Sequence, residues 1–162
     1  ELKACPGGDD GLRMPLLPDL AAPDTPVYNV DIFEACKIYP AARLDDIAAI
    51  RVQAARLPRN LALAQDQVKV ISYPKVTAHG ELEVRLDGCD GAVLARLPLP
   101  AGTTLGARFT LQGPLPAHVG THDLCMRFTA PADGPLYAIG TVRLIASSSA
   151  PAVHHLSGKS SP

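Results

Sequence analysis

The segment Glu81–Leu86 alternates charged and apolar residues without exception, and this pattern constrains the fold more than any other feature of the chain. Successive side chains of a β-strand point to opposite faces of the sheet. We therefore expect the three apolar side chains to face a core, and Glu81, Glu83 and Arg85 to face water. Residues 87–91 supply turn chemistry with two glycines, and residues 92–99 return as the partner strand of a hairpin.

Short patterned segments recur along the rest of the chain. Further strands are predicted at 11–17, 27–33, 50–55, 61–64, 67–71, 108–111, 122–129 and 136–145. Tyr39-Pro40 marks a turn or an edge because proline cannot donate to a ladder. Residues 43–47 are predicted to form a turn, with a short helix over 41–47 as the alternative. Residues 61–64 are ambiguous between strand and helix; Pro58 and the short length favour the strand.

Composition supports an all-β domain. The 16 Pro and 13 Gly residues argue against long helices, and nine or ten short strands are typical of a sandwich or barrel. The 162 residues suit one domain, with an extension over 1–26, a β-sandwich over 27–146 and a disordered tail over 147–162. The net charge of −1, with scattered Lys and Arg, argues against a nucleic-acid partner. No apolar run is long enough for a membrane span. The start lacks a signal segment, so we expect a mature form or a fragment.

Four cysteines stand at Cys5, Cys36, Cys89 and Cys125. They form no Cys-x-x-Cys pair, which argues against zinc ribbons and thioredoxin-like motifs. An even count in a Pro-rich β domain indicates two disulfides and an oxidising compartment; four buried thiols in a cytosolic domain are the alternative. Of the three possible pairings we favour Cys5–Cys36 and Cys89–Cys125. The second closes a loop of about 35 residues and would stabilise by about 4 kcal/mol.

The search for catalytic residues yields none, and the sequence predicts a non-enzyme without a metal site. Glu81 and Glu83 share one strand face, so their carboxylates lie side by side and not across a cleft as glycosidases need. His118, His122 and Asp123 suggest a metal or acid–base cluster, but adjacent residues of a strand point to opposite faces, which favours a structural role for His122. His154-His155 lies in the predicted tail. No nucleophile elbow, phosphate loop or dinucleotide fingerprint is present, although a small enzyme remains the third hypothesis.

From Tyr39 to Leu144 the order of motifs resembles the family six carbohydrate-binding modules. The resemblance is carried by Tyr39-Pro40, Leu44-Asp45, Ile50-Arg51-Val52, the run Gly80-Glu81-Leu82-Glu83-Val84-Arg85-Leu86-Asp87, Gly91, Leu94, Gly120-Thr121-His122-Asp123-Leu124, Phe128, Ile139 and Leu144. Within that group, the combination of Cys36, Tyr39-Pro40, Leu57-Pro58 and residues 80–85 is similar to C-terminal regions of bacterial family 20 β-N-acetylhexosaminidases. The resemblance implies a jelly-roll β-sandwich of two antiparallel sheets.

The resemblance also implies a sugar site at loops on one edge, often beside a structural calcium, where aromatic rings and an amide hold a pyranose. This chain departs from that pattern. Ala138-Ile139-Gly140-Thr141 stands where the family commonly has Asn before Ile-Asp-Trp, so the amide, the acidic residue that accompanies calcium and the Trp are all absent. We therefore expect no cofactor and no calcium. Tyr28, Phe33 and Tyr137, with Arg108 as a hydroxyl partner, remain as candidate sugar-binding residues, and core or rim positions are the alternative for each aromatic.

These observations lead to two main functional hypotheses. The first is a non-catalytic carbohydrate-binding accessory domain of a secreted or periplasmic glycoside hydrolase, with a glycan containing N-acetylglucosamine as its ligand and a β-N-acetylhexosaminidase as its parent protein. Its partners would be that glycan and a catalytic domain of the same protein. The second is a structural or protein-interaction module with a degenerate sugar site, which predicts a contiguous apolar patch away from the loop edge.

Overall fold

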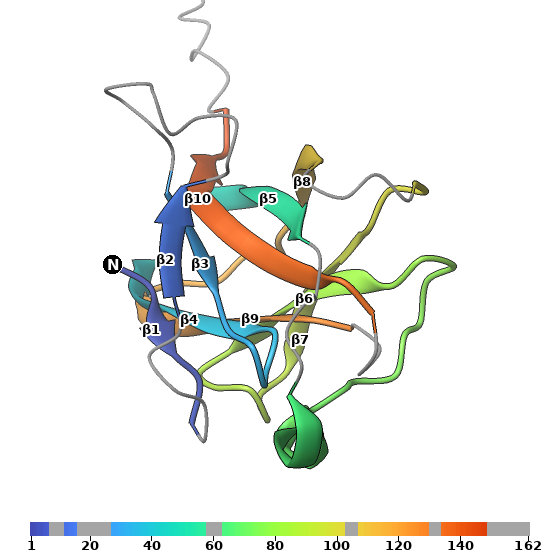
Figure 1. Cartoon of the computed structure of the whole chain (residues 1–162). Helices are drawn as coiled ribbons and strands as arrows, with labels where there is room; N and C mark the ends of the chain where they lie inside the picture. The colour runs from blue at the N-terminus through green and yellow to red at the C-terminus, as the bar shows by residue number, and fades with distance from the viewer. Residues whose placement is uncertain (7–11, 16–26, 58–62, 103–106, 130–133, 149–162) are drawn as a thin grey trace, which may run out of the picture.

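A computed structural model of the chain describes residues 1–6, 12–15, 27–57, 63–102, 107–129 and 134–148 (Figure 1). Almost all regular structure within these ranges is strand. The strands are β1 (Lys3–Ala4), β2 (Leu12–Pro15), β3 (Val27–Val30), β4 (Cys36–Arg43), β5 (Ile47–Leu57), β6 (Glu81–Leu86), β7 (Val93–Pro98), β8 (Arg108–Pro114), β9 (Thr121–Phe128) and β10 (Leu136–Ala146). One short 3₁₀-helix, η2 (Ala64–Lys69), stands between β5 and β6.

The strands form two five-stranded sheets that face each other. Sheet A has the order β1-β4-β9-β6-β7 and sheet B the order β2-β3-β10-β5-β8, and every pairing between these strands is antiparallel. Neighbours within a sheet come from distant parts of the chain, as the blue β1 beside β4 and the orange β10 between β3 and β5 show in Figure 1. The predicted all-β sandwich of two antiparallel sheets is confirmed.

The core lies between the sheets and consists of the side chains that alternation directs inward. Its fully buried members include Ile50, Val52 and Ala54 of β5, Leu82 and Val84 of β6, and Leu124, Met126 and Phe128 of β9. The Phe128 ring stacks on that of Tyr137 from the opposite sheet, with ring centroids 4.9 Å apart. The inward orientation predicted for Leu82 and Val84 is therefore confirmed.

Glu81 and Glu83 do not face water, and this prediction was wrong. Their exposed fractions are 0% and 4%. The segment that follows η2 supplies hydrogen-bond donors to Glu81 through the backbone of Val76 and Thr77. Glu83 forms ion pairs with Arg85 and Arg127. Carboxylates tolerate burial when donors or cations compensate for the lost water, and all of these partners except Arg85 come from outside the alternating segment.

The strand predicted at 67–71 is absent, and this prediction was also wrong. Residues 64–69 form η2, with local bonds such as Asp66 N to Leu63 O at 2.8 Å. Every residue of η2 is at least partly exposed, so no second strand supports an extended backbone there. Ile71 makes only an isolated bridge to Glu34. Of the strand predicted at 61–64, residues 61 and 62 lie outside the described part of the chain, and Ala64 belongs to η2.

The turns around β4 agree with the sequence. Pro40 lies beyond β1, which pairs with β4 only at Lys37 and Ile38, so the missing N–H faces an unpaired edge. β4 and β5 are joined by a tight turn closed by the bond from Ile47 N to Leu44 O, 3.1 Å long. The turn predicted at 43–47 is confirmed, and no helix forms there.

Both predicted disulfides are present: Cys5 is bonded to Cys36 and Cys89 to Cys125. The first attaches the N-terminal segment to β4, and the second attaches the turn after β6 to β9. No helix among the described residues is long and apolar enough to cross a membrane. Most of the predicted tail, residues 149–162, lies outside the described residues.

Candidate functional site

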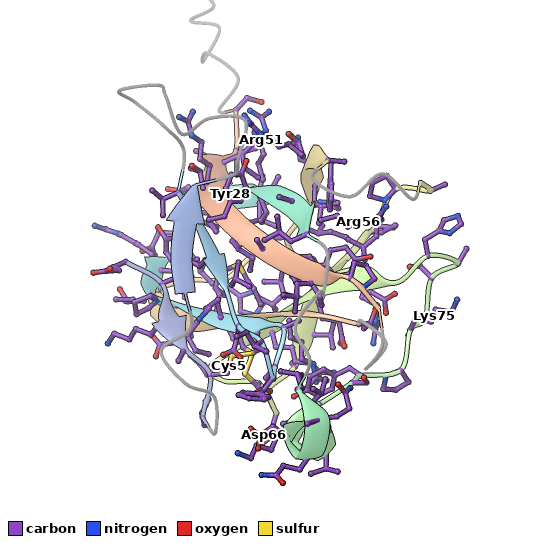
Figure 2. The ribbon with its side chains drawn as sticks, viewed as in Figure 1. Cys5, Tyr28, Arg51, Arg56, Asp66 and Lys75 are labelled. Carbon is purple, nitrogen blue, oxygen red and sulfur yellow. A yellow bond between two sulfur atoms is a disulfide. The ribbon has the colours of Figure 1, made fainter. Side chains whose placement is uncertain are left out.

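Two of the predicted sugar-binding aromatics, Tyr28 and Phe33, have different surroundings although both lie on or just after β3. Tyr28 on β3 has an exposed fraction of 3% and lies against Gly140 of β10, where an added Cβ would stand 3.0 Å from the ring (Figure 2). It belongs to a small apolar cluster on the outer face of sheet B, separate from the main core. Phe33 follows β3, where the Asp31 carboxylate accepts hydrogen bonds from the backbone N–H groups of Phe33 and Glu34. The Nζ of Lys69 is 5.8 Å from the centre of the Phe33 ring.

The other two predicted residues, Tyr137 on β10 and Arg108 on β8, lie on strands that β5 separates, and on opposite faces of sheet B. Tyr137 is turned into the core, 7% exposed, and is paired in register with Arg56. Arg108 is exposed and paired in register with Ala55. The guanidinium of Arg56 lies 5.5 Å from the centre of the Tyr137 ring (Figure 2). The four predicted residues therefore do not form one site, and Arg56 was not anticipated.

A hollow of about 510 Å³ opens at the rim of the sandwich, where sheets A and B diverge. Tyr39 and Pro40 of β4 form one side of it. Asn29 of β3 and residues 140–142 of β10 form the other side, and Glu1 and Leu2 also contribute to the lining. None of the four predicted residues lines this hollow.

Two β-bulges face each other across the hollow. On β4 the register against β9 shifts between Tyr39 and Ala42, and on β10 the register against β5 shifts between Ile139 and Val142. The β4 irregularity includes Ala41, whose φ is +51° and whose backbone N–H donates to the Asp123 carboxylate at 2.8 Å. Bulges redirect side chains and are common beside binding sites, and a non-glycine residue with positive φ is held only by surrounding contacts.

The groups around the hollow suit a polar ligand that also has an apolar face. Tyr39 presents a half-buried ring, and Thr141 and Glu1 contribute a hydroxyl and a carboxylate. Asn29 is held in place by donating from Nδ2 to the carbonyl oxygen of Ile139 at 3.0 Å. That bond uses one of the four hydrogen-bonding positions of the amide. An aromatic ring beside an anchored amide is the combination that binds a pyranose.

The fold of this chain is similar to that of several solved structures. A family 6 carbohydrate-binding module from Clostridium stercorarium, solved with cellobiose, has a TM-score of 0.56 and 12% identity, with 91% of this chain and 87% of that one covered. One from Clostridium cellulolyticum, solved with xylose, has a TM-score of 0.52 and 14% identity over 82% and 84%. A β-1,3-glucan-binding family 6 module from Bacillus halodurans has a TM-score of 0.54 and 16% identity, with 78% of this chain and 81% of that one covered. The fold is that of a family 6 carbohydrate-binding module.

Comparison by sequence adds no relative. No family model matches the chain, and no curated protein matches it either. Residues 103–106, which precede the predicted site residue Arg108, lie outside the described residues. The hollow between the bulges is the candidate site among the described residues.

The acidic and histidine residues weighed as catalytic have structural contacts. The imidazole of His122 contacts the carbonyl oxygen of Val119 at 2.9 Å and the carboxylate of Asp87 at 2.9 Å. The Val119 carbonyl, followed by Asp87, raises the pKa of His122. Burial raises the pKa of Glu81, but the bonds from Thr77 and Val76 outweigh it and hold this pKa below its ordinary value. The hydrogen bonds of His122 and Glu81 therefore hold the adjacent loop segments against sheet A.

A second polar network covers the outer face of sheet A. The ring of Tyr73 lies 4.0 Å from the guanidinium carbon of Arg127, and its hydroxyl donates to the Glu34 carboxylate. Burial, with that hydrogen bond, raises the pKa of Tyr73 to about 12. The aromatic ring is thus occupied by protein groups and holds the segment after η2 against the sheet.

Proposed function

We propose that this domain is a non-catalytic carbohydrate-binding accessory module that holds a sugar in the rim hollow. The observation that carries the proposal is the meeting of the Tyr39 ring and the anchored Asn29 amide in one hollow, between two facing bulges. The ring would lie against the apolar face of the sugar, while the Asn29 amide and the Thr141 hydroxyl would bind its hydroxyl groups. The shared fold of modules solved with cellobiose and xylose supports this assignment.

The ligand and context are proposed more narrowly from the sequence resemblance. We propose a glycan containing N-acetylglucosamine as ligand and a family 20 β-N-acetylhexosaminidase as parent enzyme. The two disulfides support an exported, secreted or periplasmic protein, because disulfides persist in oxidising compartments. The accessory module would raise the local concentration of glycan near the catalytic domain.

Titration with chito-, cello- and xylo-oligosaccharides, followed by nuclear magnetic resonance, tests the proposal. Binding should shift the amide signals of residues that line the hollow. Tyr39→Leu keeps the apolar volume but removes the ring and should weaken binding about tenfold, the equivalent of about 1.4 kcal/mol. Asn29→Ala should weaken it by a similar factor. Arg108→Ala, on the outer face of the edge strand β8, is the matched control and should leave binding unchanged.

Two results would contradict the proposal in different ways. If no sugar shifts any signal at millimolar concentration while the protein is folded, the carbohydrate-binding function is wrong. If a sugar binds but Arg108→Ala weakens it and Tyr39→Leu does not, the function stands and the site lies at the loop edge predicted from the sequence.

A second candidate function is favoured by three exposed aliphatic side chains. Val68, Ile71 and Val76 are 88%, 46% and 70% exposed within the segment around and after η2. Aliphatic side chains grouped in this way occur where another domain docks, which would make the domain an interaction module. Titrating the separately expressed upstream part of the parent protein tests this, because Val68→Ser with Val76→Ser should abolish any complex and leave sugar binding unchanged.

A further inference from the structure

The four cysteine sulfurs form one compact cluster on sheet A. The Sγ atoms of Cys5, Cys36, Cys89 and Cys125 all lie within 4.8 Å of one another, and Figure 2 shows the yellow sulfurs gathered beside Cys5. They come from four separate segments: the residue after β1, β4, the turn after β6, and β9. Two disulfides in one domain need no contact with each other, so this convergence calls for its own explanation.

The spacing between the two disulfides is that of a tetrathiolate metal site. Sulfurs of different disulfides are separated by 3.5 Å (Cys36 to Cys125), 3.6 Å (Cys36 to Cys89), 3.6 Å (Cys5 to Cys89) and 4.0 Å (Cys5 to Cys125). A Zn²⁺ ion with Zn–S bonds of about 2.3 Å holds its four sulfurs about 3.8 Å apart along the edges of a tetrahedron. Four of the six edges already have this length. Only the two sulfur pairs that are bonded in the disulfides must move apart to this distance. Rotation of the cysteine side chains after reduction can provide this movement.

The charges around the cluster favour thiolates. Arg127 is paired in register with Cys36, and Arg85 is paired in register with Cys125. Both guanidiniums contact a single carboxylate, that of Glu83, at 3.4 Å and 2.8 Å. Arg85 and Arg127 therefore place two cations on the cysteine-bearing face of sheet A, and Glu83 offsets one of their charges. A tetrathiolate with one Zn²⁺ has a charge of −2, and nearby arginines lower the pKa of thiols.

The cluster is enclosed but can be reached from solvent. Cys5, Cys36 and Cys125 are 3%, 2% and 0% exposed, whereas Cys89 is half-buried. A hollow of about 340 Å³ lies next to the cluster, lined among others by Ala4 and Pro6, which flank Cys5, and by Gly88, which precedes Cys89. This hollow offers a route for a reductant and for an ion.

We propose that the reduced domain binds one Zn²⁺ through Cys5, Cys36, Cys89 and Cys125. Each disulfide is reduced by one phosphine and one water, giving two thiols and one phosphine oxide. The four thiols then bind Zn²⁺ and release four protons. The same four residues thus cross-link β1, β4, the β6–β7 turn and β9 in either redox state, by disulfides in an oxidising compartment and by metal in a reducing one.

The test is metal binding by the full chain after anaerobic reduction with a water-soluble phosphine in mild urea, followed by removal of the urea with Zn²⁺ or Co²⁺ present. We expect one metal per chain by elemental analysis, and tetrahedral cobalt absorption with thiolate-to-cobalt charge-transfer bands. The reduced, metal-free chain should unfold at a lower urea concentration than the zinc form, and a chelator should remove that difference.

Variants separate this site from adventitious binding. Cys5→Ser with Cys36→Ser keeps the Cys89–Cys125 disulfide and should weaken Zn²⁺ binding about 100-fold or more, because two of four ligands are lost. Cys89→Ser, at the most exposed ligand, is the second variant if the first does not fold, and should abolish the four-thiolate cobalt spectrum. His154→Ala with His155→Ala is the control and should bind as the wild type does.

The proposal is overturned if the reduced chain takes up less than half an equivalent of metal. It is equally overturned if the cysteine variants bind as tightly as the wild type, or if zinc does not raise the urea concentration at which the reduced chain unfolds. None of these results bears on the sugar proposal, which is tested on the oxidised protein.

Discussion

Replacing Glu81 with glutamine should destabilise the domain by about 3 kcal/mol, although the two side chains have nearly the same shape. The buried carboxylate accepts bonds from Val76 N at 2.9 Å, Thr77 N at 3.0 Å and Thr77 Oγ1 at 2.8 Å. Both Thr77 bonds reach the same oxygen. Glutamine replaces one oxygen with a donor that faces donors, and a bond to a charged acceptor contributes about 1.5–3 kcal/mol. Losing the hydrogen bonds to one carboxylate oxygen therefore accounts for the estimated destabilisation of about 3 kcal/mol.

Urea denaturation at neutral pH measures this loss as a shift of the midpoint at constant slope. Asp66→Asn is the control, because the Asp66–Lys69 pair at 2.8 Å is exposed and should contribute less than about 1 kcal/mol.

The pH dependence gives an independent check on the same substitution. Burial raises the pKa of Glu81, but the bonds from Thr77 and Val76 outweigh it, so the folded pKa lies below the ordinary value of 4.5. The stabilisation is therefore present above 4.5 and is lost as the pH falls through the folded pKa. The difference between wild type and Glu81→Gln should shrink over that range. A variant within about 0.5 kcal/mol of wild type at neutral pH, or a difference that does not change with pH, would refute the reasoning.

Two further predictions concern the turns around sheet A. The Val119 carbonyl and the Asp87 carboxylate raise the folded pKa of His122 above the ordinary 6.5, so the stabilisation from His122 is present below pH 6.5 and is lost as the pH rises through the folded pKa. The urea midpoints of wild type and His122→Gln should therefore converge at alkaline pH. A difference in midpoint that does not change with pH would contradict this. Gly91→Ala should lower the free energy of unfolding by more than about 1 kcal/mol, because the new Cβ would stand 1.7 Å from the carbonyl oxygen of Leu86. An unchanged melting temperature would show that the turn relaxes without loss of stability.

The candidate sugar site was only partly accessible to sequence reasoning. The aromatics Tyr28 and Tyr137 were predicted from their positions near expected loops, but both prove to be largely buried. Tyr39 was noticed for the proline that follows it, and no sequence signal joined it to Asn29. Their proximity depends on bulges in two different sheets. Pro40 and Gly140 stand within the two bulged stretches and are residues that often mark bulges, but no local pattern shows that the two bulges line one hollow.

The sequence by itself determined most of the strands and their inward faces, because alternation is a property of the extended backbone and needs no partner. Leu82 and Val84 face the core for that reason. The sequence did not predict β4, and the strand predicted at 67–71 is absent. What covers the outer face was decided by the tertiary structure, which brings Thr77 and Arg127 to Glu81 and Glu83. The cysteines show the same division. Their number and spacing indicated two disulfides, whereas the convergence of all four sulfurs follows from the strand order β1-β4-β9-β6, which no local pattern in the chain specifies.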